Sequence, residues 1–187
     1  TERFVVIGDA NGDVIYDRNL TEILEGSDYQ HYARELVLLY QQNDGQNTSV
    51  TEWLEGAHYF RHHHVSLENK KSVQRFCRFM TGTAKALVLA GGGTRGWAHV
   101  GAMRAVYESG LEFDLVGGTS AGSVVSAIYA RGATYEELSD GMDRLLKSSL
   151  EVLRMANYTL PVVSISNAKA NTLLLEQLFG ETQIEQL

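Results

Sequence analysis

The sequence lacks several features that mark other classes of protein. Its 187 residues contain one cysteine, Cys77, and one proline, Pro161. A single cysteine excludes an internal disulfide and fits a reducing compartment. No apolar run approaches the roughly 20 residues that a helix needs to cross a bilayer. Residues 1–4 have neither the basic nor the apolar region of a secretory signal. We therefore expect an intracellular protein, in the cytoplasm or at the cytoplasmic face of a membrane.

An excess of positive charge is also missing. The formal net charge is −7, so free nucleic acid is an unlikely partner on electrostatic grounds. Hydrophobic residues make up 44% of the chain and charged residues 21%, which is typical of a globular protein with a buried core and excludes a disordered chain. The length allows one domain, or one domain with a small companion segment.

Residues 1–78 are predicted to form the companion, a small α/β segment. Phe4–Ile7 and Glu35–Tyr40 are nearly continuous apolar runs, typical of strands covered on both faces. Residues 21–25 and 29–34 between them favour helix, which gives a β-α-β order. The alternative is a hairpin that turns at Asn11-Gly12, because Asn-Gly favours the tight turn between antiparallel strands. That hairpin would pair the first strand with residues 14–16.

Four histidines lie close together in this segment, at positions 58, 62, 63 and 64. They suggest a zinc site, but no Cys, Asp or Glu completes a ligand spacing known for zinc. Neighbouring side chains of an extended chain also point to opposite faces. We therefore predict a strand that faces solvent or a partner, with no metal. The sequence does not assign a function to the cluster.

From Lys85 onward the composition changes, and strands alternate with glycine loops and helices. This order predicts β-α-β units and a mostly parallel sheet between layers of helices, a three-layer αβα fold. The expected elements are a strand at 86–90, a helix after 96 that ends at Gly110, a strand at 113–116, a helix at 123–131, and a helix opened by a capping box at 134–137.

The second glycine loop carries a candidate nucleophile. The residues Gly118, Thr119, Ser120, Ala121 and Gly122 match the pattern G-x-S-x-G. In this pattern the serine occupies a sharp turn between a strand and a helix, where its hydroxyl is exposed. The helix N-terminus behind the serine favours negative charge on a neighbouring oxygen. A plain β-α turn with a capping serine is the structural alternative.

The first glycine loop is predicted to bind an anionic oxygen. Gly91, Gly92 and Gly93 place unblocked N–H groups at a helix start, with Arg95 close by. Arg95 either aids the oxyanion or clamps loop carbonyls. A dinucleotide site would need an acid at the end of the following strand, whereas Asp114 lies at its start. The two loops leave adjacent parallel strands at one edge, so nucleophile and oxyanion donors should meet in an acyl-transfer site.

A general base is not apparent. None of the six histidines follows Ser120, so the order serine, acid, histidine of α/β hydrolases cannot be completed. His99 is interpreted as a packed or surface residue. Asp-Gly pairs occur at 44–45, before the serine, and at 140–141, inside a predicted helix.

Together these loops resemble the patatin-like phospholipase family. The run Gly-Gly-Gly-Thr-Arg-Gly is followed after 27 positions by Gly-Thr-Ser-Ala-Gly. Residues 35–40, 51–54, the histidine run and 79–82 further resemble the neuropathy target esterase branch and its bacterial relatives. The resemblance implies a Ser-Asp dyad, with Ser120 as nucleophile and the first glycine loop as oxyanion hole. It also implies hydrolysis of phospholipid or lysophospholipid esters at a membrane surface, without metal or cofactor.

The family's dyad aspartate lies in an Asp-Gly-Gly or Asp-Gly-Ala motif well beyond the nucleophile, and this chain has no such motif there. We therefore interpret residues 79–187 as the front part of a catalytic domain without its base, and expect this chain alone to be inactive and prone to self-associate. The alternatives are a regulatory or lipid-binding module that kept the loops, and a nucleotide-binding α/β domain.

Overall fold

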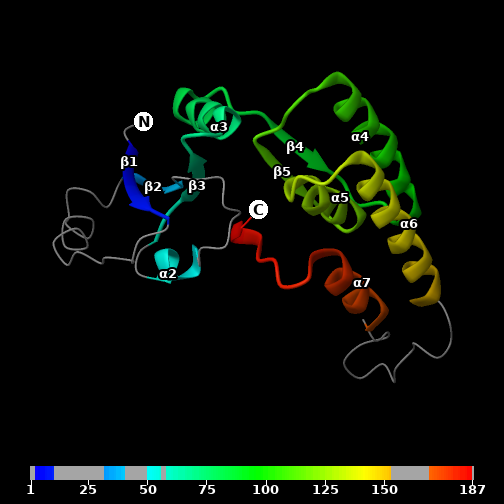
Figure 1. Ribbon diagram of the computed structural model, residues 1–187. Coiled ribbons are helices and arrows are strands. Elements are labelled where there is room, and N and C mark those ends of the chain that lie inside the picture. Colours follow the sequence, from blue (N-terminus) through cyan, green and yellow to red (C-terminus); the bar gives the residue numbers. More distant parts are fainter. Residues whose placement is uncertain (1–2, 11–31, 41–49, 56–57, 153–168, 187) are drawn as a thin grey trace. The chain divides into compact units, whose positions relative to one another are not determined.

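The computed structural model describes residues 3–10, 32–40, 50–55, 58–152 and 169–186 (Figure 1). The chain divides into two compact units. The N-terminal unit comprises Thr1–Ala84 and the C-terminal unit Lys85–Glu185. The predicted boundary at residue 79 falls inside a helix of the N-terminal unit, whereas the change of composition at Lys85 coincides with this division.

The N-terminal unit is built on a parallel sheet of strand order β1-β2-β3. The central strand is the most deeply buried, because both of its edges are paired and Leu36 and Leu38 are fully inaccessible. The described elements are β1 (Arg3–Asp9), β2 (Ala33–Tyr40), α2 (Val50–Glu55), β3 (Arg61–Ser66) and α3 (Lys70–Thr81).

The pairing of β1 with β2 is parallel, which agrees with the β-α-β order. The helix expected between these strands, and the competing hairpin, lie outside the described residues, and so does the Asp-Gly pair at 44–45. The predicted end of the helix is wrong. Ala33 and Arg34 open β2 and pair with Arg3 and Phe4, so strand pairing overrides the local helical preference.

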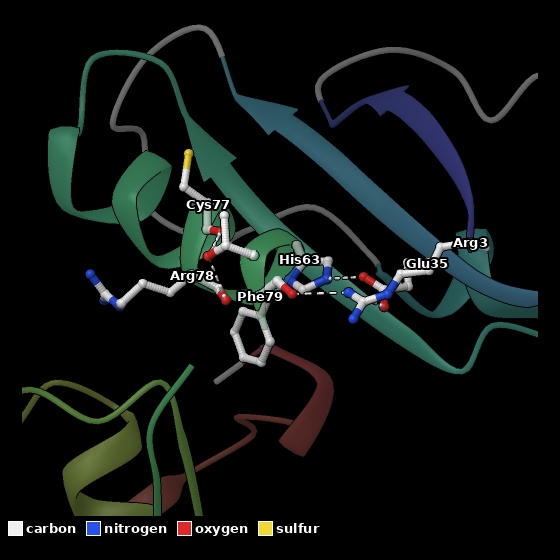
Figure 2. A network of polar contacts seen from close by, with 7 residues as sticks. Arg3, Glu35, His63, Cys77, Arg78 and Phe79 are labelled. Carbon is white, nitrogen blue, oxygen red and sulfur yellow. Dashed lines mark hydrogen bonds and ion pairs between the residues drawn. The ribbon is translucent and has the colours of Figure 1, made fainter. Parts of the chain in front are cut away.

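Strand β3 carries three of the four histidines, His62, His63 and His64, but the prediction of a strand facing solvent or a partner is wrong for His63. This side chain is 2% exposed and its Nε2 lies 2.9 Å from Oε2 of the buried Glu35 (Figure 2). The His62 and His64 rings share the opposite face and meet edge to face, with their ring centroids 5.4 Å apart. Because side chains alternate between the two faces of a strand, His63 lies on one face and His62 and His64 lie on the other.

Arg3 completes this buried network. Its Nη1 donates to the Phe79 carbonyl at 2.9 Å and lies 3.4 Å from Oε1 of Glu35 (Figure 2). The His63 ring packs against the rings of Phe76 and Phe79 at 5.3 and 5.0 Å. Burial lowers the pKa of His63, against the opposing effect of its bond to Glu35.

The C-terminal unit pairs β4 and β5 in parallel, and α5 packs against both strands. Its core is apolar and is formed mainly by α4, α5 and α6. The described elements are β4 (Ala86–Leu89), the 3₁₀ turn η1 (Gly93–Gly96), α4 (Trp97–Ser109), β5 (Leu115–Gly118), α5 (Ala121–Ala130), α6 (Tyr135–Val152), α7 (Lys169–Phe179) and the 3₁₀ turn η3 (Ile184–Gln186). The predicted α/β class with parallel strands is confirmed.

Two boundaries in this unit differ from the prediction. Strand β5 begins at Leu115, two residues later than expected. Asp114 is not part of the strand, because it bonds to Lys85, which directly precedes β4. Its Oδ2 accepts from the Lys85 N–H at 2.9 Å and its own N–H donates to the Lys85 carbonyl at 2.8 Å. Helix α5 begins at Ala121, directly after the serine.

Two local predictions are confirmed: the end of α4 at Gly110 and the capping box that opens α6. Gly110 ends α4 in the left-handed conformation at φ 66°. The Thr134 N–H donates to Oε2 of Glu137 at 2.7 Å, and the Glu137 N–H donates to Oγ1 of Thr134 at 3.3 Å. The hydrogen bond from the Thr134 N–H lowers the pKa of the Glu137 carboxyl.

Candidate active site

Ser120 occupies a strained turn between β5 and α5. Its φ of 53° is the one positive value among the described non-glycine residues, and its side chain is exposed. A serine in this conformation is rarely tolerated without a functional reason. The turn is held by the Gly122 N–H, which donates to the Thr119 carbonyl at 3.0 Å, and by the Ser123 hydroxyl, which donates to the Ser120 carbonyl at 2.6 Å.

The two glycines of G-x-S-x-G are required by close backbone contacts. A Cβ atom on Gly118 would lie 2.3 Å from the carbonyl carbon of Gly122. A Cβ atom on Gly122 would lie 2.3 Å from the Leu89 carbonyl oxygen. The first glycine thus lets the turn close on itself, and the second lets α5 lie against the end of β4.

The glycine loop after β4 lies beside the serine. The Thr119 N–H donates to the Leu89 carbonyl at 3.1 Å, which continues the pairing of the strands into the loops. A Cβ atom on Gly91 would lie 3.4 Å from the Cβ of Ser120. The two loops therefore meet at one end of the sheet, as the order of the elements predicts.

Backbone donors are available next to Ser120. Within the described residues, no backbone hydrogen bond uses the N–H groups of Gly91, Gly92, Gly93 or Ala121. Gly93 has a φ of 55°, which glycine adopts without strain and other residues rarely do. Ala121 opens α5, so its N–H carries the partial positive charge of a helix start.

The helix start behind Ser120 was expected to favour an oxyanion, and the structure identifies the Ala121 N–H as its first donor. Ala121 also explains why position 96 is a glycine, because a Cβ atom there would lie 2.5 Å from the Cβ of Ala121. The last glycine of the first loop could have signalled this contact, since glycines at such positions allow a helix to pack closely.

His99 and Arg95 have different surroundings. His99 is half-buried, and its Nε2 bonds to the Ala90 carbonyl at 2.7 Å, so this ring anchors the start of the glycine loop. Arg95 is exposed on η1, and in the described part of the chain its guanidinium forms no hydrogen bond or ion pair. The structure therefore does not show it clamping loop carbonyls.

Among the described residues, no base lies against Ser120, and the Ser120 hydroxyl has no hydrogen-bonding partner. Asp140 lies on the exposed side of α6, 2.9 Å from Arg144. Asp114 is 3% exposed and bonds to Lys85 at the end of the strands opposite to the glycine loops. It therefore cannot serve as the acidic residue that a dinucleotide site requires.

No group of three metal-ligating side chains occurs within the described ranges. None of the helices that the structure describes is both long and apolar enough to cross a bilayer.

Comparison with known proteins identifies one family. A family model described as patatin-like phospholipase matches residues 87–187. No solved structure matches the chain.

Among curated proteins, the chain is 39% identical over 114 residues to patatin-like phospholipase domain-containing protein 6 of Homo sapiens, which covers 60% of this chain and 8% of that protein. It is 28% identical over 182 residues to neuropathy target esterase sws of Drosophila persimilis, which covers 82% of this chain and 13% of that protein. The chain thus spans about a tenth of the length of these relatives. Because the family match extends over more than half of its residues, the protein belongs to the patatin-like phospholipase family.

Proposed function

We propose that the protein contributes the nucleophile and the oxyanion hole to the hydrolysis of acyl esters in phospholipids or lysophospholipids. The observation that carries the proposal is the conformation of Ser120, exposed at a φ of 53° with Gly91 close by. Backbone strain at an exposed serine between a strand and a helix is the geometry expected of a nucleophile.

In the proposed reaction, the Ser120 hydroxyl attacks the ester carbonyl while a carboxylate takes its proton. The carbonyl oxygen becomes an oxyanion that accepts hydrogen bonds from the glycine loop and from the Ala121 N–H. The alcohol leaves, and water then hydrolyses the acyl-serine. Arg95 lies on the same loop and adds positive charge near the developing oxyanion.

The carboxylate is proposed to come from outside residues 1–187. None of the Asp-Gly pairs follows Ser120 at the distance that the family resemblance requires, and Asp140 is already paired with Arg144. An unassisted serine is a weak nucleophile at neutral pH, so residues 1–187 alone should show at most a small residual rate.

The substrate class follows from the family and the relatives, two of which carry phospholipase or esterase in their names. Long-chain phospholipids reside in membranes, so we place the protein peripherally at a membrane surface. No nucleic-acid partner and no cofactor are proposed.

The test compares residues 1–187 with a fusion that appends the downstream catalytic segment of patatin-like phospholipase domain-containing protein 6. We expect the fusion to hydrolyse lysophospholipid and to react with a fluorophosphonate probe at Ser120. Ser120→Ala should abolish labelling and lower the rate by about 10⁶, the loss typical of removing a serine nucleophile, with an unchanged melting temperature. Substantial turnover by that variant would show that another residue attacks.

Two other outcomes decide the details. Robust hydrolysis by residues 1–187 alone, dependent on Ser120, would show that a base lies within this chain. A fusion that folds and binds lipid without labelling would favour the non-catalytic lipid-binding module, for which the unpartnered serine is the supporting observation.

A further inference from the structure

Positive charge is concentrated in one short stretch of an otherwise acidic chain. Residues 61–85 contain six of the 16 Lys and Arg residues and a single acid, Glu68. This stretch carries a net charge of +5, which leaves −12 on the rest of the molecule. The stretch includes β3 and α3.

Helix α3 has a well-defined polar side. At about 100° per residue, Lys70, Lys71, Gln74 and Arg78 share one side of the helix. The opposite side is apolar, with Phe79 only 3% exposed. We call the side formed by Lys70, Lys71, Gln74 and Arg78 the basic face. Figure 2 shows the Arg78 side chain directed away from the buried network.

The helix is capped at both ends, so the basic face is presented on an ordered element. The Asn69 side chain accepts from the Lys71 N–H at 3.0 Å, and Gly82 closes the last turn at φ 72°. Lys70, Lys71 and Gln74 are exposed, and Arg78 is half-buried.

A large apolar side chain lies at the start of this helix. Leu67 is 68% exposed in the turn between β3 and α3, where the Asn69 N–H donates to the Ser66 carbonyl at 3.1 Å. An exposed leucine beside several cations is the combination that favours a lipid interface, because headgroups attract the charges and the acyl boundary accepts the leucine.

We propose that the basic face of α3, with Leu67 at its start, docks on the headgroup surface of an anionic lipid bilayer. The proposal rests on the proposed function for its choice of partner, since a phospholipid hydrolase must reach a lipid interface. The charge distribution supports it, because −12 on the remaining residues repels an anionic surface and leaves this side to approach. Residues 82–85 alone separate α3 from β4, so docking tethers the catalytic unit near its substrate.

The test measures sedimentation of residues 1–187 with vesicles of phosphatidylcholine, with and without phosphatidylserine. We expect binding only to the anionic vesicles, weakened by salt. Each basic residue at such a surface adds roughly fivefold in affinity. Replacing Lys70, Lys71 and Arg78 by Gln should weaken binding by about 100-fold.

A matched control removes the same charge from the C-terminal unit. Arg104→Gln, Arg144→Gln and Lys147→Gln together should leave vesicle binding within about twofold. Equal losses in the two triple variants would overturn the proposal, because net charge and not the basic face would then govern binding.

A label on the wild-type chain covers the case in which the variant does not fold. Cys77 is exposed on α3 and is the one cysteine of the chain, so it accepts an environment-sensitive dye. The emission should shift to the blue with anionic vesicles and not with phosphatidylcholine alone. An unshifted spectrum on bound protein would overturn the proposal.

Two further arms identify the partner. Leu67→Gln should reduce the binding that persists in high salt, and an unchanged remainder would contradict the role of the leucine. Binding of a single-stranded oligonucleotide as tight as that of the vesicles, and lost in the same variant, would point to nucleic acid instead. Ser120→Ala should bind vesicles like the wild type, so failure of the proposed hydrolysis and failure of docking remain distinguishable.

Discussion

The two units of this protein differ in where they place the polar side chains that attract notice in the sequence. The N-terminal unit buries Glu35 and His63 at 1% and 2% exposure. The C-terminal unit keeps an apolar core and leaves Ser120 exposed at its surface. Glu35 and His63 bond to each other, whereas the C-terminal unit leaves the Ser120 hydroxyl and several N–H groups without protein partners among the described residues.

This contrast separates structural from chemical use of the same kinds of residue. Judged by distance alone, a histidine and a carboxylate whose polar atoms lie 2.9 Å apart would suggest a catalytic pair. Their burial gives a substrate no access, so the pair holds β2 against β3. In the proposed function, the reactive group is Ser120, whose hydrogen-bonding capacity is unused among the described residues and whose backbone is strained.

The largest expected effect on stability comes from breaking the buried pair. Glu35→Ala should lower the free energy of unfolding of the N-terminal unit by about 1–3 kcal/mol, the typical cost of leaving a buried hydrogen-bonding group, here His63, without its partner. Trp53 and Trp97 lie in different units, so urea unfolding followed by Trp53 fluorescence in a Trp97→Phe background reports this unit alone.

The exposed acid Glu68 provides the control for that measurement. Glu68→Ala should change the stability by less than about 0.5 kcal/mol, as surface substitutions usually do. A loss of similar size in both variants would show that the Glu35 network is not a stabilising element.

The contrast predicts that Gly91→Ala affects activity rather than folding. The added Cβ would lie 3.4 Å from the Cβ of Ser120 and 3.3 Å from the Thr119 carbonyl, a tight but tolerable fit. In the active fusion, we expect the hydrolysis rate to fall by about 10²–10³, the loss typical of removing one oxyanion donor. The melting temperature should stay within a few degrees of the wild type.

Gly101→Ala serves as the matched substitution, because a Cβ there meets nothing within 4 Å. It should leave the rate unchanged and stabilise α4 by about 0.5–1 kcal/mol, since alanine favours helix over glycine. Full activity in Gly91→Ala would remove this loop from the proposed mechanism.

The N-terminal unit should also lose stability in mild acid. Burial lowers the pKa of His63 below its ordinary 6.5, so the unfolded chain binds a proton at a pH where the folded protein does not. As the pH falls below about 6.5, the free energy of unfolding should therefore drop, by at most about 1.4 kcal/mol per pH unit, until the folded pKa is reached.

The groups that face His63 set how far this drop extends. Glu35 favours the charged ring, whereas Arg61 and Arg75 oppose it and the rings of Phe76 and Phe79 exclude water. Unfolding by urea between pH 7.5 and about 5 measures the effect. His63→Gln should flatten the profile and His62→Gln should not. The reverse result would assign the acid sensitivity to the exposed face of β3.

The smallest effect concerns the capping box of α6 in the C-terminal unit. Thr134→Ala removes the hydroxyl that accepts from the Glu137 N–H and should cost about 1 kcal/mol. Trp97 fluorescence in a Trp53→Phe background would report the change. Thr134→Ser keeps the hydroxyl and should retain most of the stability, and an equal loss in both variants would rule out capping as the cause.

Local patterns predicted the elements of the C-terminal unit well. Glycine at 110 and the capping box at 134–137 act within one turn of a helix, so the sequence shows them directly. The start of β5 was misplaced because Asp114 is held by Lys85, 29 positions away. No window of neighbouring residues contains that contact.

By itself, the sequence determined the order of strands and glycine loops and the family, and it led to the proposal of Ser120 and the first glycine loop as the site. These depend on short motifs whose chemistry is carried by adjacent residues. Only the tertiary structure decided that His63 is buried against Glu35, that Ala33 and Arg34 belong to a strand, and that the Ala121 N–H is a donor beside the serine. The physical reason is that burial and pairing depend on residues distant in the chain, and a local pattern does not record which of them meet.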